Sequence, residues 1–128
     1  MTREIKFRAW NGRSFWYDFH LSGYGTEICE TGDRYNLEDN EKIILSQFTG
    51  LKDKHGKDIY EGDVIKITLF GNCIIVWNAA VCSFQYAYHA IGKGMATGGR
   101  MTNTLYKYES ETNYEVVGNI YQNSDLIK

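Results

Sequence analysis

Short segments in which apolar and polar residues alternate recur along this chain, and they constrain its fold more than any other feature. Alternation with a period of two is typical of β-strands that have one buried face. Glu4–Trp10 alternates in this way, Asn11-Gly12 follows as a hairpin turn signal, and Phe15–Leu21 alternates again. The sequence therefore predicts an N-terminal β-hairpin.

The remaining strands are predicted at similar spacing along the chain, at Ile43–Phe48, Val64–Leu69, Cys73–Trp77, Val81–Ile91, Leu105–Tyr108 and Tyr114–Ile120. Gly23–Glu41 is polar and acidic, and we expect it to form a loop with one short strand. The segment 92–104 is rich in glycine and lacks periodicity, which indicates a loop. Many short strands separated by turns favour a small barrel or sandwich.

Composition limits the class of protein. The 128 residues suit one domain, and an aromatic content of 15% favours strands. A net charge of −2 gives no general attraction to nucleic acid or to anionic membranes. The first residues lack the apolar core of a signal peptide, and three cysteines without a disulfide spacing suit a reducing compartment. We therefore expect a cytoplasmic protein that does not enter a membrane.

Three motifs resemble those of the YopX family of phage proteins. Arg3–Trp10 is similar to the start of these proteins, Gln47–Ile65 to their most distinctive motif, and Tyr114–Tyr121 to their C-terminal motif. The resemblance implies a phage or prophage origin and an SH3-like barrel for the C-terminal part. It implies no established activity, so no catalytic residue is transferred.

Taken together, these observations predict an all-β fold in which an N-terminal β-hairpin region packs on a small SH3-like barrel. A single YopX-like domain would cover 1–128, with the hairpin and acidic loop in 1–42 and the barrel in 43–128. We interpret the family motif as a scaffold for turns. Its residues with this structural role are Thr49, Gly50, Leu51, Asp53, Gly56, Ile59, Tyr60, Gly62, Asp63, Gly118 and Asn119. Ile59 and Tyr60 would anchor the motif on the core, whereas Lys52, Asp53, Lys54, Lys57 and Asp58 would face water.

Metal and catalytic sites find little support in the sequence. Cys73, Cys82 and His89 lack the paired spacing of zinc ligands, and cysteines on alternating strands are usually core residues. His20 beside Asp18 has the chemistry of a general base, but an exposed polar hairpin face explains the pair more simply. We expect no metal site, no cofactor and no enzymatic activity.

Two further charged segments have simpler structural explanations. The carboxylates Asp53, Asp58, Glu61 and Asp63 alternate with lysines, which favours neutralised surface over Mg²⁺ or acid–base chemistry. The glycine-rich segment lacks the order of a P-loop, although its backbone amides with Lys93 or Arg100 have the chemistry of a phosphate cradle.

The most favoured role is a non-enzymatic binding or adaptor protein that acts on a macromolecular partner in the host cytoplasm. A protein partner or self-association through exposed strand edges is preferred, because the charge is near neutral and aromatic strands are plentiful. The alternative is nucleic-acid binding, in which bases stack on aromatic side chains beside basic ones. The candidate binding surface for either role comprises Arg8, Trp10, Arg13, Trp16, Tyr86, Tyr88, Lys93, Arg100 and Tyr106.

Overall fold

The structure is a computed structural model of the chain. It describes residues 4–17, 19–22, 27–30, 33–36, 43–68, 70–89 and 100–123. In chain order its elements are β1 (Phe7–Trp10), β2 (Phe15–Trp16), β3 (His20–Ser22), β4 (Glu27–Glu30), β5 (Asp33–Asn36), β6 (Ile44–Lys52), β7 (Asp58–Tyr60), β8 (Asp63–Ile67), β9 (Gly71–Asn78), β10 (Ser83–His89), β11 (Arg100–Thr104), α1 (Lys107–Asn113) and β12 (Glu115–Asn119).

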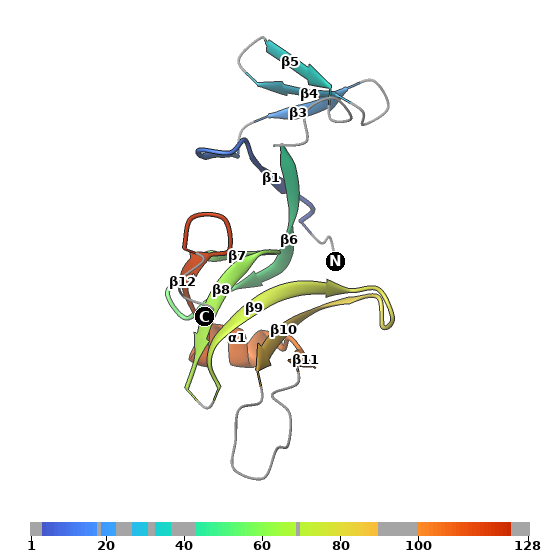
Figure 1. Cartoon of the computed structure of the whole chain (residues 1–128). Coiled ribbons are helices and arrows are strands. Elements are labelled where there is room, and N and C mark those ends of the chain that lie inside the picture. Colours follow the sequence, from blue (N-terminus) through green and yellow to red (C-terminus); the bar gives the residue numbers. More distant parts are fainter. Residues whose placement is uncertain are drawn as a thin grey trace. The chain divides into compact units, whose positions relative to one another are not determined.

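The chain forms two compact units, residues 5–47 and residues 48–128, and strand β6 runs from the first into the second (Figure 1). The first half of β6 pairs antiparallel with β1, and the second half pairs with β7. In the first unit, β3, β4 and β5 form a separate three-stranded antiparallel sheet. The strands dominate both units, which confirms the all-β class.

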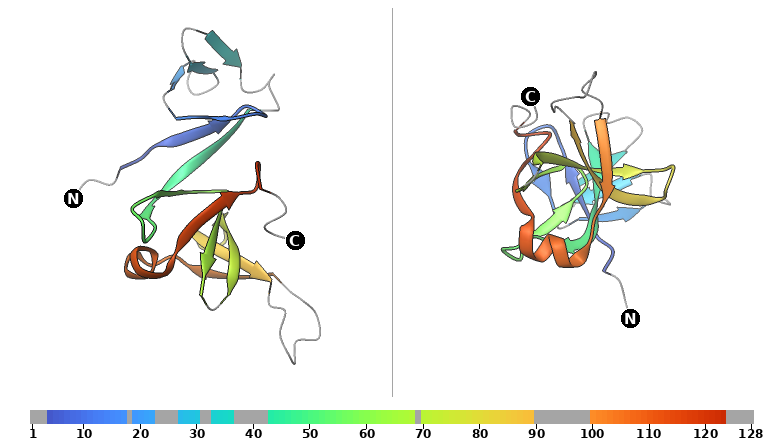
Figure 2. Two further views of the ribbon diagram at one scale, coloured as in Figure 1. Left: turned by 90° about the vertical axis from the view of Figure 1, so that its left-hand side faces the viewer. Right: turned by 90° about the horizontal axis from the view of Figure 1, so that it is seen from below.

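The second unit contains a five-stranded antiparallel sheet that curls into a half-barrel (Figures 1 and 2). Its strand order is β11-β10-β9-β8-β12, so β8 to β11 form a meander and the chain then returns through α1. The last strand, β12, pairs with the first, β8.

One hydrophobic core fills the concave side of the half-barrel. It consists of Ile59, Ile65, Ile67, Cys73, Ile75, Tyr86 and Tyr114. Most of these residues occupy alternate positions of β8, β9 and β10, as the period-two pattern predicts. The predicted anchoring of Ile59 and Tyr60 on the core is confirmed, because both side chains are buried.

The N-terminal hairpin is confirmed, with a longer turn than Asn11-Gly12 alone. Trp10 pairs with Phe15, so the turn contains four residues, 11–14. Asn11 closes it, because its Oδ1 accepts hydrogen bonds from the Arg13 and Ser14 amides at 2.8 and 2.9 Å. Gly12 has a φ of +98°, which explains the glycine at this position.

The observed elements differ from the predicted ones in several places. The predicted strand Phe15–Leu21 is divided between β2 and β3, which belong to different sheets, and strand β7 was not predicted. The acidic segment contains two strands, β4 and β5, where one was expected. The end of the predicted glycine-rich loop is strand β11, which pairs with β10. The predicted strand at Leu105–Tyr108 gives way to helix α1, in which Lys107 lies 4.0 Å from Glu111 one turn later. Charged helix-forming residues outweigh the strand preference of the tyrosines in this segment.

Candidate binding surface

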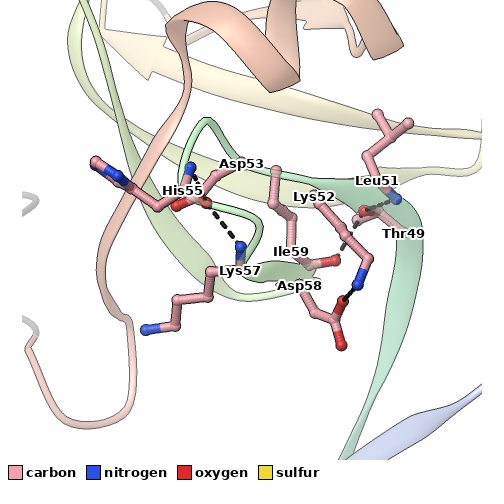
Figure 3. Close-up of polar contacts among 8 residues, drawn as sticks. All are labelled: Thr49, Leu51, Lys52, Asp53, His55, Lys57, Asp58 and Ile59. Atoms are coloured by element: carbon pink, nitrogen blue, oxygen red, sulfur yellow. Dashed lines mark hydrogen bonds and ion pairs between the residues drawn. The ribbon is translucent and has the colours of Figure 1, made fainter.

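The family motif is held together by the carboxylate of Asp53 (Figure 3). Its Oδ1 accepts hydrogen bonds from the amides of His55 and Lys57, both at 2.9 Å. Its Oδ2 accepts a third from the Val116 amide, also at 2.9 Å. Asp53 is only 3% exposed, so the expectation that it faces water was wrong. A buried carboxylate needs such donors, and here it ties the motif to strand β12.

The same turn covers the outer edge of β12. The Lys54 amide donates to the Tyr114 carbonyl at 2.9 Å, beside the Val116 amide that donates to Asp53. Strand β12 pairs with β8 on its other side. The Asp53 turn therefore bonds to the outer backbone groups at the start of β12.

Other motif residues also bond backbone groups. Thr49 Oγ1 donates to the Ile59 carbonyl at 2.7 Å, and Asp63 Oδ2 accepts from the Tyr60 amide at 2.8 Å. Asn119 Oδ1 accepts from the amides of the next turn, Tyr121 and Gln122. The positive φ expected of Gly50, Gly56 and Gly62 is confirmed at +89°, +80° and +88°. The carboxylates expected at a neutralised surface are thus partly internal, since Asp53 and Asp63 are both buried.

Lys52 and Lys54 face water as expected and form weak ion pairs, whereas Asp58, also expected to face water, is half-buried. Lys52 lies 3.3 Å from Asp58, and Lys54 lies 3.5 Å from Glu115. In Figure 3 the side chains of His55 and Lys57 point away from the Asp53 carboxylate, although their amides bond to it. The amides that could bind an external anion are therefore occupied by a side chain of the protein itself.

A different surface is formed by the β9–β10 hairpin. Residues Cys73, Ile75 and Trp77 alternate along one face of β9; the first two are fully buried, whereas Trp77 is 47% exposed. Phe84 lies directly opposite Trp77 on β10, with ring centroids 5.0 Å apart in an edge-on arrangement. Val81, in the turn between the strands, is 56% exposed. The core-facing side of the hairpin thus continues past the core to the exposed Trp77 and the half-buried Phe84. These two residues and Val81 of the adjoining turn form an apolar surface, which we call the hairpin patch (Trp77, Val81 and Phe84).

A sequence signal for this patch exists and was missed. No Asp, Glu, Lys or Arg occurs between Ile67 and Gly92, which includes all of β9 and β10. Both strands were predicted, although Val81 and Cys82, which were placed in the second strand, lie in the turn. Alternation gives no indication of where the apolar face leaves the core. Cys82 shows the same limit: it was expected in the core, yet it is exposed in the turn with a φ of +50°.

The sequence-predicted binding residues are divided between the two units. Trp10 and Trp16 are half-buried and Arg13 is exposed in the first unit, and Tyr106 is exposed in the second. Tyr88 is half-buried and stacks on Phe70 at 4.3 Å. The side chain of Arg100 and all of Lys93 lie outside the described residues.

Two residues of the predicted binding surface, Arg8 and Tyr86, are buried, so their prediction as surface residues was wrong. Arg8 is 4% exposed because its guanidinium packs over the Phe15 ring, 4.1 Å from its centroid. Tyr86 is also 4% exposed, since it lies in the half-barrel core against Tyr114. Neither side chain is available to a phosphate or a base.

Burial changes the acidity of several groups. It raises the pKa of the Cys73 thiol to about 11, and it raises the pKa values of the Tyr114 and Tyr86 hydroxyls. Burial also raises the pKa of the Glu61 carboxyl. These shifts follow from packing in the core and do not create a nucleophile, because a raised pKa leaves less thiolate at neutral pH.

Metal ligands do not converge in the part of the chain that the structure describes: no group of three His, Cys, Asp or Glu residues there could hold an ion. Asp18 and the side chains of His20 and His89 lie outside that part, as does the glycine-rich segment up to Gly99. Within the same described part, no helix has the length and apolar character needed to cross a membrane.

Comparison with protein families identifies the relatives of this chain. The family model described as YopX protein matches residues 6–128. The chain belongs to the YopX family. No curated protein matches this YopX-family chain.

A solved structure is similar to this YopX-family protein over its whole length. The crystal structure of protein EF1440 from Enterococcus faecalis matches with a TM-score of 0.53 and 22% sequence identity. The match covers 99% of this chain and 100% of that chain. At this identity, the likeness supports the fold alone.

Proposed function

We propose that this YopX-family protein is a non-enzymatic binding protein that contacts a protein partner through the hairpin patch. The observation that carries the proposal is the exposure of Trp77 beside Phe84 on an uncharged β-hairpin. A phage or prophage origin and action in the host cytoplasm are parts of the same proposal, and they rest on the resemblance described above.

The chemistry of the hairpin patch fits a protein surface better than other classes of partner. Tryptophan and other aromatic residues dominate the energetic centres of protein interfaces, and charged residues are depleted there. The patch combines an exposed indole, a second ring and an aliphatic side chain, without a charged residue on either strand. A phosphate backbone would need cations that this hairpin lacks.

The motif residues support a structural role beside this binding surface. Asp53 and Asp63, the two buried carboxylates of the motif, both accept backbone hydrogen bonds. Carboxylates engaged in this way are poor candidates for proton transfer, because their lone pairs already have donors. The proposed activity is therefore assigned to the hairpin and the maintenance of the fold to the motif.

The proposal is tested by capturing partners from a lysate of the bacterium that carries the gene. The bait is the wild-type chain, a Trp77→Ser/Phe84→Ser variant, or a Tyr108→Ser control, in which the lost ring is 79% exposed on α1. We expect the hairpin variant to recover at least about tenfold less of the proteins that wild type and the control capture. Equal recovery by all three baits, with circular dichroism showing intact folds, would contradict the proposal.

A second assay addresses nucleic acid directly. Labelled single-stranded and duplex DNA and RNA are titrated with wild-type protein at low and physiological salt, and fluorescence anisotropy is recorded. We expect no change at either salt concentration. Binding that weakens steeply with salt would show that the protein neutralises phosphates. That result would favour a nucleic acid over a protein as the partner.

A further inference from the structure

The two ends of the half-barrel sheet differ in how their edges are covered. At one end, the Asp53 turn bonds to the outer side of β12 through Lys54 and Val116. At the other end, β11 pairs with β10, and no strand among the described residues pairs with its second side (Figure 2). Alternate amides and carbonyls of such an edge strand point away from its neighbour. Strand β11 therefore offers backbone donors and acceptors along its outer side, although the Thr104 amide already donates to Asn103 Oδ1 at 3.0 Å.

The sequence of β11 lacks the features that usually prevent a sheet edge from pairing. Natural edge strands carry charged residues, prolines or bulges at their centre. The centre of β11 is Met101-Thr102-Asn103, which has no charge, and the chain contains no proline. The pairing with β10 continues without a register shift from Arg100 to Thr104. Thr102 and Asn103 are exposed.

We propose that β11 pairs antiparallel with β11 of a second copy of this chain, which joins two half-barrels into a continuous sheet. A two-fold axis at Thr102 would place Thr102 opposite its own copy and Arg100 opposite Thr104. No like charges meet in this register, and threonine pairs facing each other on one side of a sheet are favourable. The interface is self-complementary, as a two-fold dimer requires.

We assign a second copy to this edge because the register about Thr102 is self-complementary and brings no like charges together. The inference is independent of the proposed function, since the hairpin patch lies at the turn between β9 and β10 and β11 is two strands away from β9. The Trp77→Ser/Phe84→Ser variant should therefore self-associate as wild type does.

Sedimentation equilibrium over a concentration series tests the pairing. We expect wild type to approach twice its 14.8 kDa mass, within a range that reaches about 1 mM so that even weak association is seen. Thr102→Lys and Thr102→Glu each place like charges opposite one another at the axis, and we expect each to raise the dimer dissociation constant at least about tenfold. An equimolar mixture of the two variants should recover the dimer, because lysine then faces glutamate.

The matched control is Thr112→Lys, which adds the same charge at an exposed threonine of α1 and should leave association unchanged. Equal urea midpoints for the Thr102 variants and wild type would show that the fold is retained. A wild-type chain that stays monomeric throughout would overturn the inference. So would a dimer that neither Thr102 variant weakens, or a mixture that associates no better than its components.

Discussion

The family motif and the β9–β10 hairpin lie in the same compact unit, yet their side chains are used in opposite ways. The motif, from Thr49 to Asp63, is polar in sequence, and its key polar side chains bond inward to backbone groups: Asp53 and Asp63 accept from amides, and Thr49 donates to a carbonyl. The hairpin is apolar in sequence, and it carries part of its apolar face into solvent at Trp77. The polar motif residues that resemble a chemical site thus maintain the fold, whereas part of the apolar face of the hairpin is exposed.

This difference shows that charged residues in a motif do not by themselves indicate a binding or catalytic site. A tight turn can require a carboxylate to accept hydrogen bonds from its backbone amides. A turn that leaves several amides without intrachain carbonyls must be completed by a side chain, and Asp53 completes this one. A hairpin longer than its core needs no such group, because its strands satisfy one another. The part of the hairpin that extends past the core can then form a binding surface.

The largest effect is expected from removing the motif carboxylate. Asp53→Ala leaves three amides without their acceptor and should lower the free energy of unfolding by about 3–5 kcal/mol, measured by urea denaturation. Glu115→Ala is the control, since it removes only an exposed ion pair with Lys54 and should cost less than about 1 kcal/mol. Similar losses for the two variants would mean that the motif is not held by Asp53.

The next prediction compares two positions on one face of β9. Ile75→Ala opens a cavity in the core and should cost about 2–5 kcal/mol, because the side chain is fully buried. Trp77→Ala removes a larger side chain but should cost only about 1 kcal/mol, mainly the edge-on contact with Phe84. Urea midpoints of the two variants measure the difference. A greater loss at Trp77 would show that the hairpin patch belongs to the core.

A smaller difference in the free energy of unfolding is expected between alanine substitutions at two glycines, Gly62 in the motif and Gly71 at the start of the β9–β10 hairpin. At Gly62, with φ at +88°, an added Cβ would lie 3.1 Å from Tyr121 Cε2. At Gly71, with φ at +73°, it would meet no atom within 4 Å. Gly71→Ala should cost about 1–2 kcal/mol from backbone strain, and Gly62→Ala about 1 kcal/mol more from crowding. Thermal unfolding tests this order, and the reverse order would count against tight packing in the motif.

The smallest effect is a pH dependence at Glu61. Burial raises the pKa of this carboxyl above its ordinary 4.5, so the folded state favours the protonated form. Its contribution to stability is fully present below the unfolded pKa and is lost as pH rises through the folded value. The stability of wild type relative to Glu61→Gln should therefore fall as the pH rises above the ordinary pKa of 4.5. A relative stability that rises over this range would contradict the assigned cause.

Much of the fold could be predicted from the alternation of residues. The N-terminal hairpin and the strands around Ile65 and Ile75 follow from period-two patterns that local geometry enforces. Helix α1 and strand β11 could not be predicted in this way. The first has tyrosines that favour strands, and the second has residues of weak preference that become a strand by pairing with β10.

The burial of charged residues was the hardest feature to predict, because its cause lies far along the chain. Asp53 is buried through the Val116 amide, which is contributed by β12. Arg8 shares its predicted face with Lys6, but the Phe15 ring on the neighbouring strand covers its guanidinium. The hairpin patch was missed because a sequence does not show where two strands extend past the core that they cover.

Photo-crosslinking in living cells tests the central assignment, a binding hairpin and a structural motif, most directly. A benzophenone amino acid is introduced either at Val81, at the exposed turn of the hairpin, or at His55, at the exposed tip of the motif. We predict that illumination gives protein adducts from position 81 and not from position 55. Adducts from position 55 alone, or none from position 81, would contradict this assignment.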